Sequence, residues 1–203
     1  MKLSGKGIFC SGGKMSIVLF LKEYIINPKC VGAVAPSSKY LAQKMIEPID
    51  FVKCENIVEF GPGTGVFTEK ILEKRNSKTK VLIIENNEKF YEQLKNRFHN
   101  MENLYIIHGS AENVIDYMKE FNMQKADYIV SGLPFASLPS EISQKILLSA
   151  KNALSEKGSL ITFQYTLLKK KIFLQHFKNI SITREYKNIP PAYVFCCYNY
   201  DNV

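Results

Sequence analysis

The sequence of 203 residues contains neither a membrane-spanning segment nor a signal peptide pattern. No apolar run approaches the roughly 18–20 residues that a membrane-spanning helix needs. The start of the chain also lacks a signal peptide pattern, because the apolar stretch from Ile17 to Leu21 is short and no small-residue cleavage site follows it. Internal repeats and low-complexity segments are absent too. We therefore expect a cytoplasmic protein.

Cysteine is scarce and scattered. The five cysteines are Cys10, Cys30, Cys54, Cys196 and Cys197, and no pair has the C-x-x-C spacing of metal and redox sites. Cys196 and Cys197 are adjacent in a predicted strand, so their side chains should point to opposite faces. We expect buried or free thiols in a reducing compartment and no metal site.

The composition fits one sizeable globular domain with a real core, since 46% of the residues are hydrophobic. The net charge of +8 is unevenly distributed. Residues 1–53 hold eight lysines against three acidic residues, and residues 167–187 hold five lysines and one arginine against one glutamate. Such basic segments suggest an anionic partner, either nucleic acid or an acidic membrane surface. Solubilising charge without a partner is the alternative.

The sequence pattern in the first quarter of the chain predicts helices. Residues 1–14 are rich in glycine, serine and lysine and are expected to form a flexible lead-in. Helical periodicity begins at Ser16 and stops at Asn27-Pro28, and this helix is more apolar than one buried face requires. A second helix is predicted to start at Pro36-Ser37-Ser38 with a serine as N-cap. Residues 15–55 are therefore expected to form N-terminal helices.

From residue 56 onward, predicted strands alternate with predicted helices, which is typical of a parallel sheet with crossover helices. The strands are Asn56–Phe60, Lys80–Ile84, Leu104–His108, Asp127–Ser131, Ser159–Tyr165, Ile180–Tyr186 and Tyr193–Tyr200. The helices are Phe67–Lys74, Glu88–Phe98, Ala111–Phe121 and Ser140–Leu154. The last two strands are joined by the short segment Asn188–Pro191, which permits only an antiparallel pair. The fold class is thus α/β, with a seven-stranded, mostly parallel sheet over residues 56–203 and an antiparallel last strand.

The strongest motif is VEFGPGTGVF, from Val58 to Phe67, which follows a strand and opens a helix. Its glycines let the backbone turn sharply and approach a ligand, to which the helix presents its N-terminal amides. A dinucleotide-binding loop would place its third glycine one residue later. The G-x-G-x-G spacing resembles that of the class I S-adenosylmethionine-dependent methyltransferases, which have a Rossmann-like fold. The resemblance implies S-adenosyl-L-methionine as cofactor, S-adenosyl-L-homocysteine as product, and cofactor contacts from Glu59, Gly61, Pro62, Gly63, Thr64 and Gly65.

In this family the position of Glu59 lies near the amino group of the cofactor. Glu85 ends the next strand, twenty residues after Gly65, and is followed by Asn86. A carboxylate at that place can accept hydrogen bonds from both ribose hydroxyls. An ordinary solvated carboxylate that closes a strand is the alternative.

The third strand runs into Gly109-Ser110-Ala111-Glu112, the expected adenine contact. The family commonly has an aspartate where Ser110 stands, and a serine is a neutral, weaker acceptor. Glu112 is the alternative acceptor. His108, at the end of the strand, is expected to be structural rather than catalytic.

The methyl acceptor is expected at Ser131-Gly132-Leu133-Pro134-Phe135, after the fourth strand. The chain resembles the ribosomal RNA adenine dimethyltransferases, which carry N-L-P-F here. Their asparagine accepts from the target N6 amine, and the aromatic residue stacks on the flipped base. Gly132 has no side chain for that role. Those enzymes also carry a helical domain after the last strand, whereas we expect none in this chain, which ends at Val203.

A further resemblance, over about residues 15–200, is to the soluble bacterial phospholipid N-methyltransferases. It rests on FLKEYIINPKCVGAVAPSS, VEFGPGTGVFT, SGLPF, the FQYT segment at Phe163–Thr166 and NIPPAYVF at Asn188–Phe195. It implies methylation of phosphatidylethanolamine toward phosphatidylcholine at the inner face of the membrane. The N-terminal amphipathic helix would dock on anionic lipid. A helix packed as a lid over the cofactor is the alternative.

For this function we expect the Ser131 and Gly132 carbonyls to hold the lipid amine, with Phe135 and Tyr165 lining the pocket. Aromatic faces tolerate the quaternary cation that successive methylation produces. The amine must first lose a proton, with a reference pKa near the ~10.4 of lysine, and water or Tyr165 is the candidate acceptor. Candidate contacts to the lipid phosphate are Ser37, Ser38, Arg184 and Lys187. Helix capping is the alternative for the serines.

Two other functions stay open at this point. One is a nucleic-acid adenine N6-methyltransferase with an altered acceptor motif. The other is a small-molecule amine methyltransferase, or a cofactor-binding protein without catalysis of its own.

Overall fold

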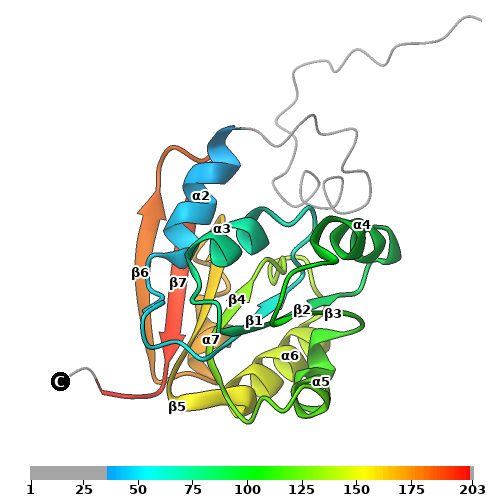
Figure 1. Ribbon diagram of the computed structural model, residues 1–203. Coiled ribbons are helices and arrows are strands. Elements are labelled where there is room, and N and C mark those ends of the chain that lie inside the picture. The colour runs from blue at the N-terminus through cyan, green and yellow to red at the C-terminus, as the bar shows by residue number, and fades with distance from the viewer. Residues whose placement is uncertain (1–35, 202–203) are drawn as a thin grey trace, which may run out of the picture.

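The computed structural model describes residues 36–201, and the predicted lead-in and first helix lie outside that range. Seven strands form one sheet in the order β3-β2-β1-β4-β5-β7-β6, with helices on both faces (Figure 1). The strands are β1 (Asn56–Phe60), β2 (Lys80–Glu85), β3 (Leu104–His108), β4 (Ala126–Ser131), β5 (Leu154–Gln164), β6 (Asn179–Glu185) and β7 (Ala192–Tyr198). The helices are α2 (Pro36–Ile46), α3 (Val66–Lys74), α4 (Glu88–Phe98), the 3-10 helix η1 (Ala111–Asn113), α5 (Val114–Glu120), α6 (Ser140–Ala153) and α7 (Lys170–Leu174).

The strand order reverses between β1 and β4. Strands β1 to β5 run parallel, whereas β7 runs antiparallel to both β5 and β6. The predicted mixed sheet and its antiparallel end are therefore confirmed. In open α/β sheets ligands bind outside the carboxyl ends of the strands at such a reversal. We therefore expect the ligand site at the edge where β1 to β5 end, which we call the carboxyl edge. The opposite edge is called the amino edge.

Two apolar cores lie on the two faces of the sheet. Val58 and Phe60 of β1 pack on the side of α5, α6 and α7, whereas Ile57 packs on the side of α2 and α3. This division follows from the alternation of side chains along a strand. The prediction for the adjacent cysteines is confirmed in the same way, since Cys197 is in the first core and Cys196 packs against the second. Both are free thiols, and burial raises the pKa of each.

Element boundaries agree with the sequence prediction to within two residues except in β5, and the helix predicted over Ala111–Phe121 is divided into η1 and α5. Strand β5 begins at Leu154 rather than Ser159, because α6 runs directly into it and its pairing with β4 shifts register opposite Ala126. The serine N-cap is wrong, since α2 begins at Pro36 and both serines lie in its first turn. Helix α7 was not predicted because five residues are too few for helical periodicity to show.

Phe173 is the fully buried residue of α7, and it packs in the core beside its neighbour Ile172. Its ring meets Phe135 at 5.2 Å and Phe195 at 5.5 Å between ring centroids, edge to face. We predict that Phe173→Ala lowers the free energy of unfolding by about 3–5 kcal/mol, because a large cavity remains. Leu174→Ala, at a neighbouring residue that is 46% exposed, should cost less than about 1 kcal/mol. Urea unfolding of both variants tests this, and equal losses would contradict it.

Candidate active site

The predicted glycine loop follows β1 at the point where the strand order reverses. Gly61, Gly63 and Gly65 have φ angles of 59°, 57° and 83°, a region that favours glycine over all other residues. The Gly61 amide donates to the Ile84 carbonyl at 2.9 Å, which ties the loop to the end of β2. Gly65 then caps α3. The loop therefore takes the sharp turn that the motif predicts.

Glu85 joins the glycine loop to the segment before α4. This carboxylate is 6% exposed, and its Oε2 accepts from the Gly63 amide at 3.0 Å. Its Oε1 accepts from the Asn87 amide at 2.8 Å. A carboxylate has about four acceptor positions, so lone pairs remain for two ribose hydroxyls. Asn86 lies next to it, exposed at the carboxyl edge. The ribose contact stays a prediction that this geometry allows.

Glu59 is a buried acidic residue that lacks a full set of partners. The Thr68 hydroxyl on α3 donates to Glu59 Oε2 at 2.7 Å, while Oε1 has no partner within residues 36–201. Burial raises the pKa of Glu59 to about 8. A buried acceptor without a donor is costly. The ammonium group of S-adenosyl-L-methionine would supply the missing donor, so Glu59 fits the predicted cofactor.

The space around the loop also fits a ligand at Gly63. A Cβ placed there would meet no atom within 4 Å, whereas at Gly61 it would lie 2.6 Å from the Leu133 side chain and at Gly65 2.9 Å from Leu94. Two of the three glycines are thus packed against the protein. The third faces open space between the ends of β1 and β2.

The adenine contacts that were predicted after β3 come together as a pair. Ser110 caps η1 by accepting from the Glu112 amide at 3.4 Å, and its hydroxyl donates to Glu112 Oε2 at 3.0 Å. The serine is therefore engaged within the protein, which favours Glu112 as the acceptor for an adenine amino group. Gly109 and Ala111 complete this turn, with the Gly109 amide bound to the Glu85 carbonyl at 3.0 Å. His108 is exposed and stacks on Tyr91, and its structural role stays a prediction.

The predicted acceptor loop after β4 lies directly against the glycine loop. The Gly132 amide donates to the Phe60 carbonyl at 2.8 Å, and a Cβ on Gly132 would lie 2.5 Å from the Gly61 carbonyl oxygen. Ser131 is fully buried, with its hydroxyl accepting from the Leu133 amide at 3.3 Å. Pro134 continues the loop and accepts through its carbonyl from the Ser137 amide at 2.8 Å. The tertiary structure thus unites the two loops that the sequence places 71 residues apart.

The two aromatic residues expected to line one pocket are not brought together. Phe135 is fully buried in the core on the α5–α7 side, edge-on to Phe173. Tyr165 packs on the opposite, α2–α3 side of the sheet, where its ring centroid lies 5.6 Å from that of Phe163. The expectation for Phe135 is corrected, because its ring supports the acceptor loop from beneath rather than facing an opening.

The predicted phosphate contacts lie on two elements that touch. Lys187, in the turn between β6 and β7, places its Nζ 4.9 Å from the ring centroid of Tyr40 on α2, the helix whose first turn contains Ser37 and Ser38. The Arg184 guanidinium stacks between Tyr186 at 4.8 Å and Tyr193 at 5.1 Å. Both cations therefore lie at the carboxyl edge beside α2.

Sequence reasoning missed three polar residues near the site. Thr68 is the partner of Glu59, and Thr162 and Gln164 of β5 each bury a polar atom without a partner in the described part of the chain. Thr162 pairs with Ser131 in the sheet register, so the two lie side by side at the carboxyl edge. The signal that was overlooked is the pair of polar residues in the otherwise apolar run ITFQ.

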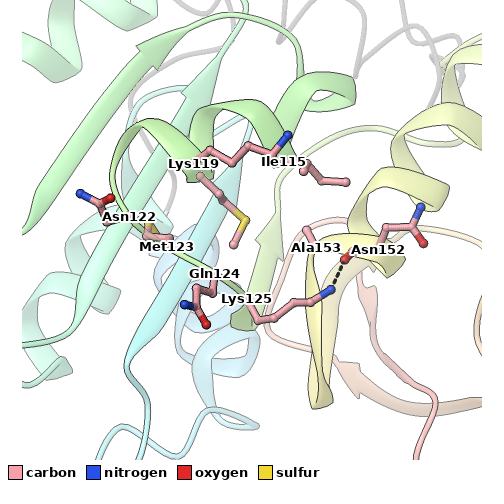
Figure 2. Close-up of a pocket in the computed structure, with 9 residues that line it drawn as sticks. Ile115, Lys119, Asn122, Met123, Gln124, Lys125, Asn152 and Ala153 are labelled. Carbon is pink, nitrogen blue, oxygen red and sulfur yellow. Dashed lines mark hydrogen bonds between the residues drawn. The ribbon is translucent and has the colours of Figure 1, made fainter.

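A pocket of about 340 Å³ lies at the amino edge, away from these loops (Figure 2). Lys125 spans it and donates from Nζ to the Asn152 carbonyl at 2.7 Å. This pocket is separate from the loops of the candidate site.

Within the described range no group of three or more His, Cys, Asp or Glu residues is placed to hold a metal ion. Nor is any helix between Pro36 and Asp201 long and apolar enough to cross a membrane.

The chain is similar to known methyltransferases in sequence. Residues 35–184 match the family model described as "Ribosomal RNA adenine dimethylase". Ornithine lipid N-methyltransferase from Singulisphaera acidiphila is 26% identical over 181 residues, which cover 88% of this chain and 94% of that protein. Ribosomal RNA small subunit methyltransferase A from Borreliella burgdorferi is 33% identical over 135 residues, which cover 65% of this chain but 44% of that protein.

Solved structures show the same fold. N-methyltransferase NodS from Bradyrhizobium japonicum, in complex with S-adenosyl-L-homocysteine, has a TM-score of 0.68 at 11% identity and covers 90% of this chain and 97% of its own. An rRNA methylase from Streptococcus thermophilus has a TM-score of 0.58 at 15% identity, covering 83% of this chain and 100% of its own. Family and fold together identify an S-adenosylmethionine-dependent N-methyltransferase with the Rossmann-like class I fold.

The raised pKa of Glu59 predicts a pH-dependent stability. Its pKa rises from 4.5 toward about 8 on folding. The fold thus favours the protonated form, and the corresponding stability is lost as pH rises from about 4.5 through about 8. Relative to Glu59→Gln, the wild-type protein should lose on the order of 3–4 kcal/mol of unfolding free energy between pH 5 and pH 8. Urea unfolding across this range measures it, with the exposed Glu55→Gln as control. Parallel curves for wild type and Glu59→Gln would contradict the assignment.

The open space at Gly63 predicts a variant that folds without binding the cofactor. Gly63→Arg fills that space, so S-adenosyl-L-homocysteine should bind at least about 100-fold more weakly by calorimetry. The left-handed backbone costs a non-glycine residue only about 1–2 kcal/mol, so the melting temperature should fall modestly. Gly63→Ala carries the same backbone cost with little added volume and should retain measurable binding. Undiminished binding by Gly63→Arg would place the cofactor elsewhere.

Proposed function

The chain belongs to the ribosomal RNA adenine dimethylase family, and from that premise we propose that it methylates the amine of a membrane phospholipid instead of an RNA base. The proposed reaction converts phosphatidylethanolamine toward phosphatidylcholine. It would take place at an anionic membrane surface, with the lipid headgroup entering at the carboxyl edge of the sheet.

The observation that carries this proposal is the packing of Gly132. A Cβ at this position would lie 2.5 Å from the Gly61 carbonyl oxygen and 3.6 Å from that of Phe60. A carbon atom is not tolerated so close to a backbone oxygen, so this backbone admits no side chain at 132. The asparagine that reads an adenine amine in the resembling RNA enzymes therefore has no place here. A lipid amine has no ring edge to be read, and backbone carbonyls are sufficient acceptors for its N–H groups.

The relatives support a lipid substrate. The ornithine lipid N-methyltransferase aligns over 94% of its own length, whereas the ribosomal RNA enzyme of Borreliella burgdorferi aligns over 44% of its length. The alignment therefore covers most of this chain and almost all of a protein named for N-methylation of a lipid. The alignment with the RNA enzyme leaves more than half of that enzyme's length unmatched.

In the proposed mechanism the protein mainly aligns the reactants. Bound S-adenosyl-L-methionine supplies an electrophilic methyl group. Glu59 would accept from the cofactor's amino group, Glu85 from its ribose, and Glu112 from its adenine. The Ser131 and Gly132 carbonyls would direct the lone pair of the amine toward that methyl group, which converts a bimolecular encounter into a positioned one.

The amine has to be neutral before it attacks. Free amines of this class are mainly protonated at pH 7, with a reference pKa near ~10.4. We propose that water or Tyr165, which lies at the end of β5, receives the proton. Arg184 and Lys187 would hold the lipid phosphate at the same edge through their donor N–H groups. The N-terminal amphipathic helix remains a second predicted contact to anionic lipid.

The reaction is tested by offering radiolabelled S-adenosyl-L-methionine with phosphatidylethanolamine vesicles, with ribosomal RNA, and with free ethanolamine. We expect label in the lipid. Label that appears only in RNA would refute the proposal, and label only in ethanolamine would favour the small-molecule alternative.

A Gly132→Asn variant tests the structural basis of the proposal by restoring the N-L-P-F motif. Because the added atoms meet the Gly61 carbonyl, we expect lower thermal stability and at least about 100-fold less lipid methylation. Leu133→Met, in the same loop, conserves volume and is the matched control, with a cost below about 1.5 kcal/mol. A Gly132→Asn variant with wild-type stability and new activity on RNA would contradict the argument.

A further inference from the structure

Large apolar side chains are exposed along the carboxyl edge. Leu168 is 86% exposed, Ile189 81%, Tyr186 69% and Leu167 46%. Two of them follow β5, and the other two lie in the turn between β6 and β7. The register pairs Gln164 with Tyr193 and Glu185 with Ala192, so both segments emerge from the same edge of the sheet. Figure 1 shows the β6–β7 turn beside α2 on that side. Isolated exposed aliphatics are common, but this group is concentrated at one edge.

Cations surround these apolar residues. Residues 167–171 read Leu-Leu-Lys-Lys-Lys, and Arg184 and Lys187 flank Tyr186 in the other segment. The acidic group among them, Glu185, is engaged with the Lys187 amide through its carboxylate at 2.7 Å. We call residues 167–171 and 184–189, together with Tyr40, the docking rim.

Resting on the proposed function, we propose that the docking rim is a membrane-contact surface built into the folded domain, separate from the N-terminal helix. Leu168 and Ile189 enter the acyl region of an anionic bilayer. The lysines and Arg184 lie at the level of the lipid phosphates. Tyr40 and Tyr186 lie between these levels, where amphipathic rings are favoured.

The chemistry of the docking rim fits a bilayer better than RNA. Single-stranded RNA is bound by aromatic or arginine planes that stack on bases, and a fully exposed leucine or isoleucine has no partner there. Burying an aliphatic side chain in hydrocarbon is favourable, and adjacent lysines add attraction to anionic headgroups. The two segments also leave the same sheet edge as the acceptor loop. A headgroup would therefore reach Gly132 while its acyl chains stay in the bilayer.

The chain contains no tryptophan, so a single introduced tryptophan reports on its own surroundings. We compare full-length Leu168→Trp and Ile189→Trp with Val52→Trp, whose position is 88% exposed just before β1 at the amino edge. With phosphatidylglycerol-containing vesicles, the two rim probes should show blue-shifted emission and quenching by lipids brominated on the acyl chains. The Val52→Trp probe should show neither.

A second measurement uses removal of the apolar tips. Leu168→Ser combined with Ile189→Ser should lower partitioning onto anionic vesicles on the order of tenfold or more. The matched pair Val52→Ser and Leu148→Ser, which removes two exposed aliphatics from other surfaces, should leave it unchanged. Rim probes that remain unshifted, equal shifts at Val52, or a response to ribosomal RNA in place of vesicles would each overturn the proposal.

Assaying methyl transfer on the same vesicles separates this inference from the proposed function. Rim probes that enter the bilayer without any lipid methylation would support the docking rim and refute the substrate. Lipid methylation with unshifted rim probes would support the substrate and refute the docking rim.

Discussion

The close contact between Gly132 and the Gly61 carbonyl sets the distance between the cofactor loop and the acceptor loop, and the rest of the site depends on it. Strands β1 and β4 are neighbours in the sheet although they are far apart in the chain, so their terminal loops meet at the carboxyl edge. Glycine on both sides of this contact removes the Cβ atoms that would hold the loops apart. Glu85 then fixes the far side of the glycine loop through the Gly63 amide.

The site combines a buried interior with an edge that exposes apolar and basic side chains. Glu59 is buried deeply enough to raise its pKa to about 8, and this cost is offset when a cationic group supplies the missing donor. At the carboxyl edge, Leu168 and Ile189 are almost fully exposed beside lysines and an arginine. The proposed lipid substrate requires both, because its amine must leave water to react while its acyl chains stay in the bilayer.

Particular residues show how far sequence pattern predicts structure. The bounds of β1, β3 and α4 were predicted to the residue, because apolar periodicity and flanking turn residues agree there. The predicted opposite directions of Cys196 and Cys197 hold because alternation is a local property of any strand. Helix α7 was missed because five residues show too little periodicity, and the contacts of its Phe173 are with Phe135 and Phe195, which are distant in the chain. Phe135 was assigned to a pocket because a motif does not say which face of the sheet a side chain packs on.

The sequence by itself determined the α/β fold, the glycine loop and the identity of the cofactor class, because each depends on residues close together in the chain: a strand end, a G-x-G-x-G turn and the start of a helix. Only the tertiary structure showed why position 132 is a glycine. Its lack of a side chain is readable in the sequence, but the reason that no side chain fits is a carbonyl 71 residues earlier. The docking rim is likewise a tertiary property, since parallel and antiparallel pairing bring two separate segments to one edge.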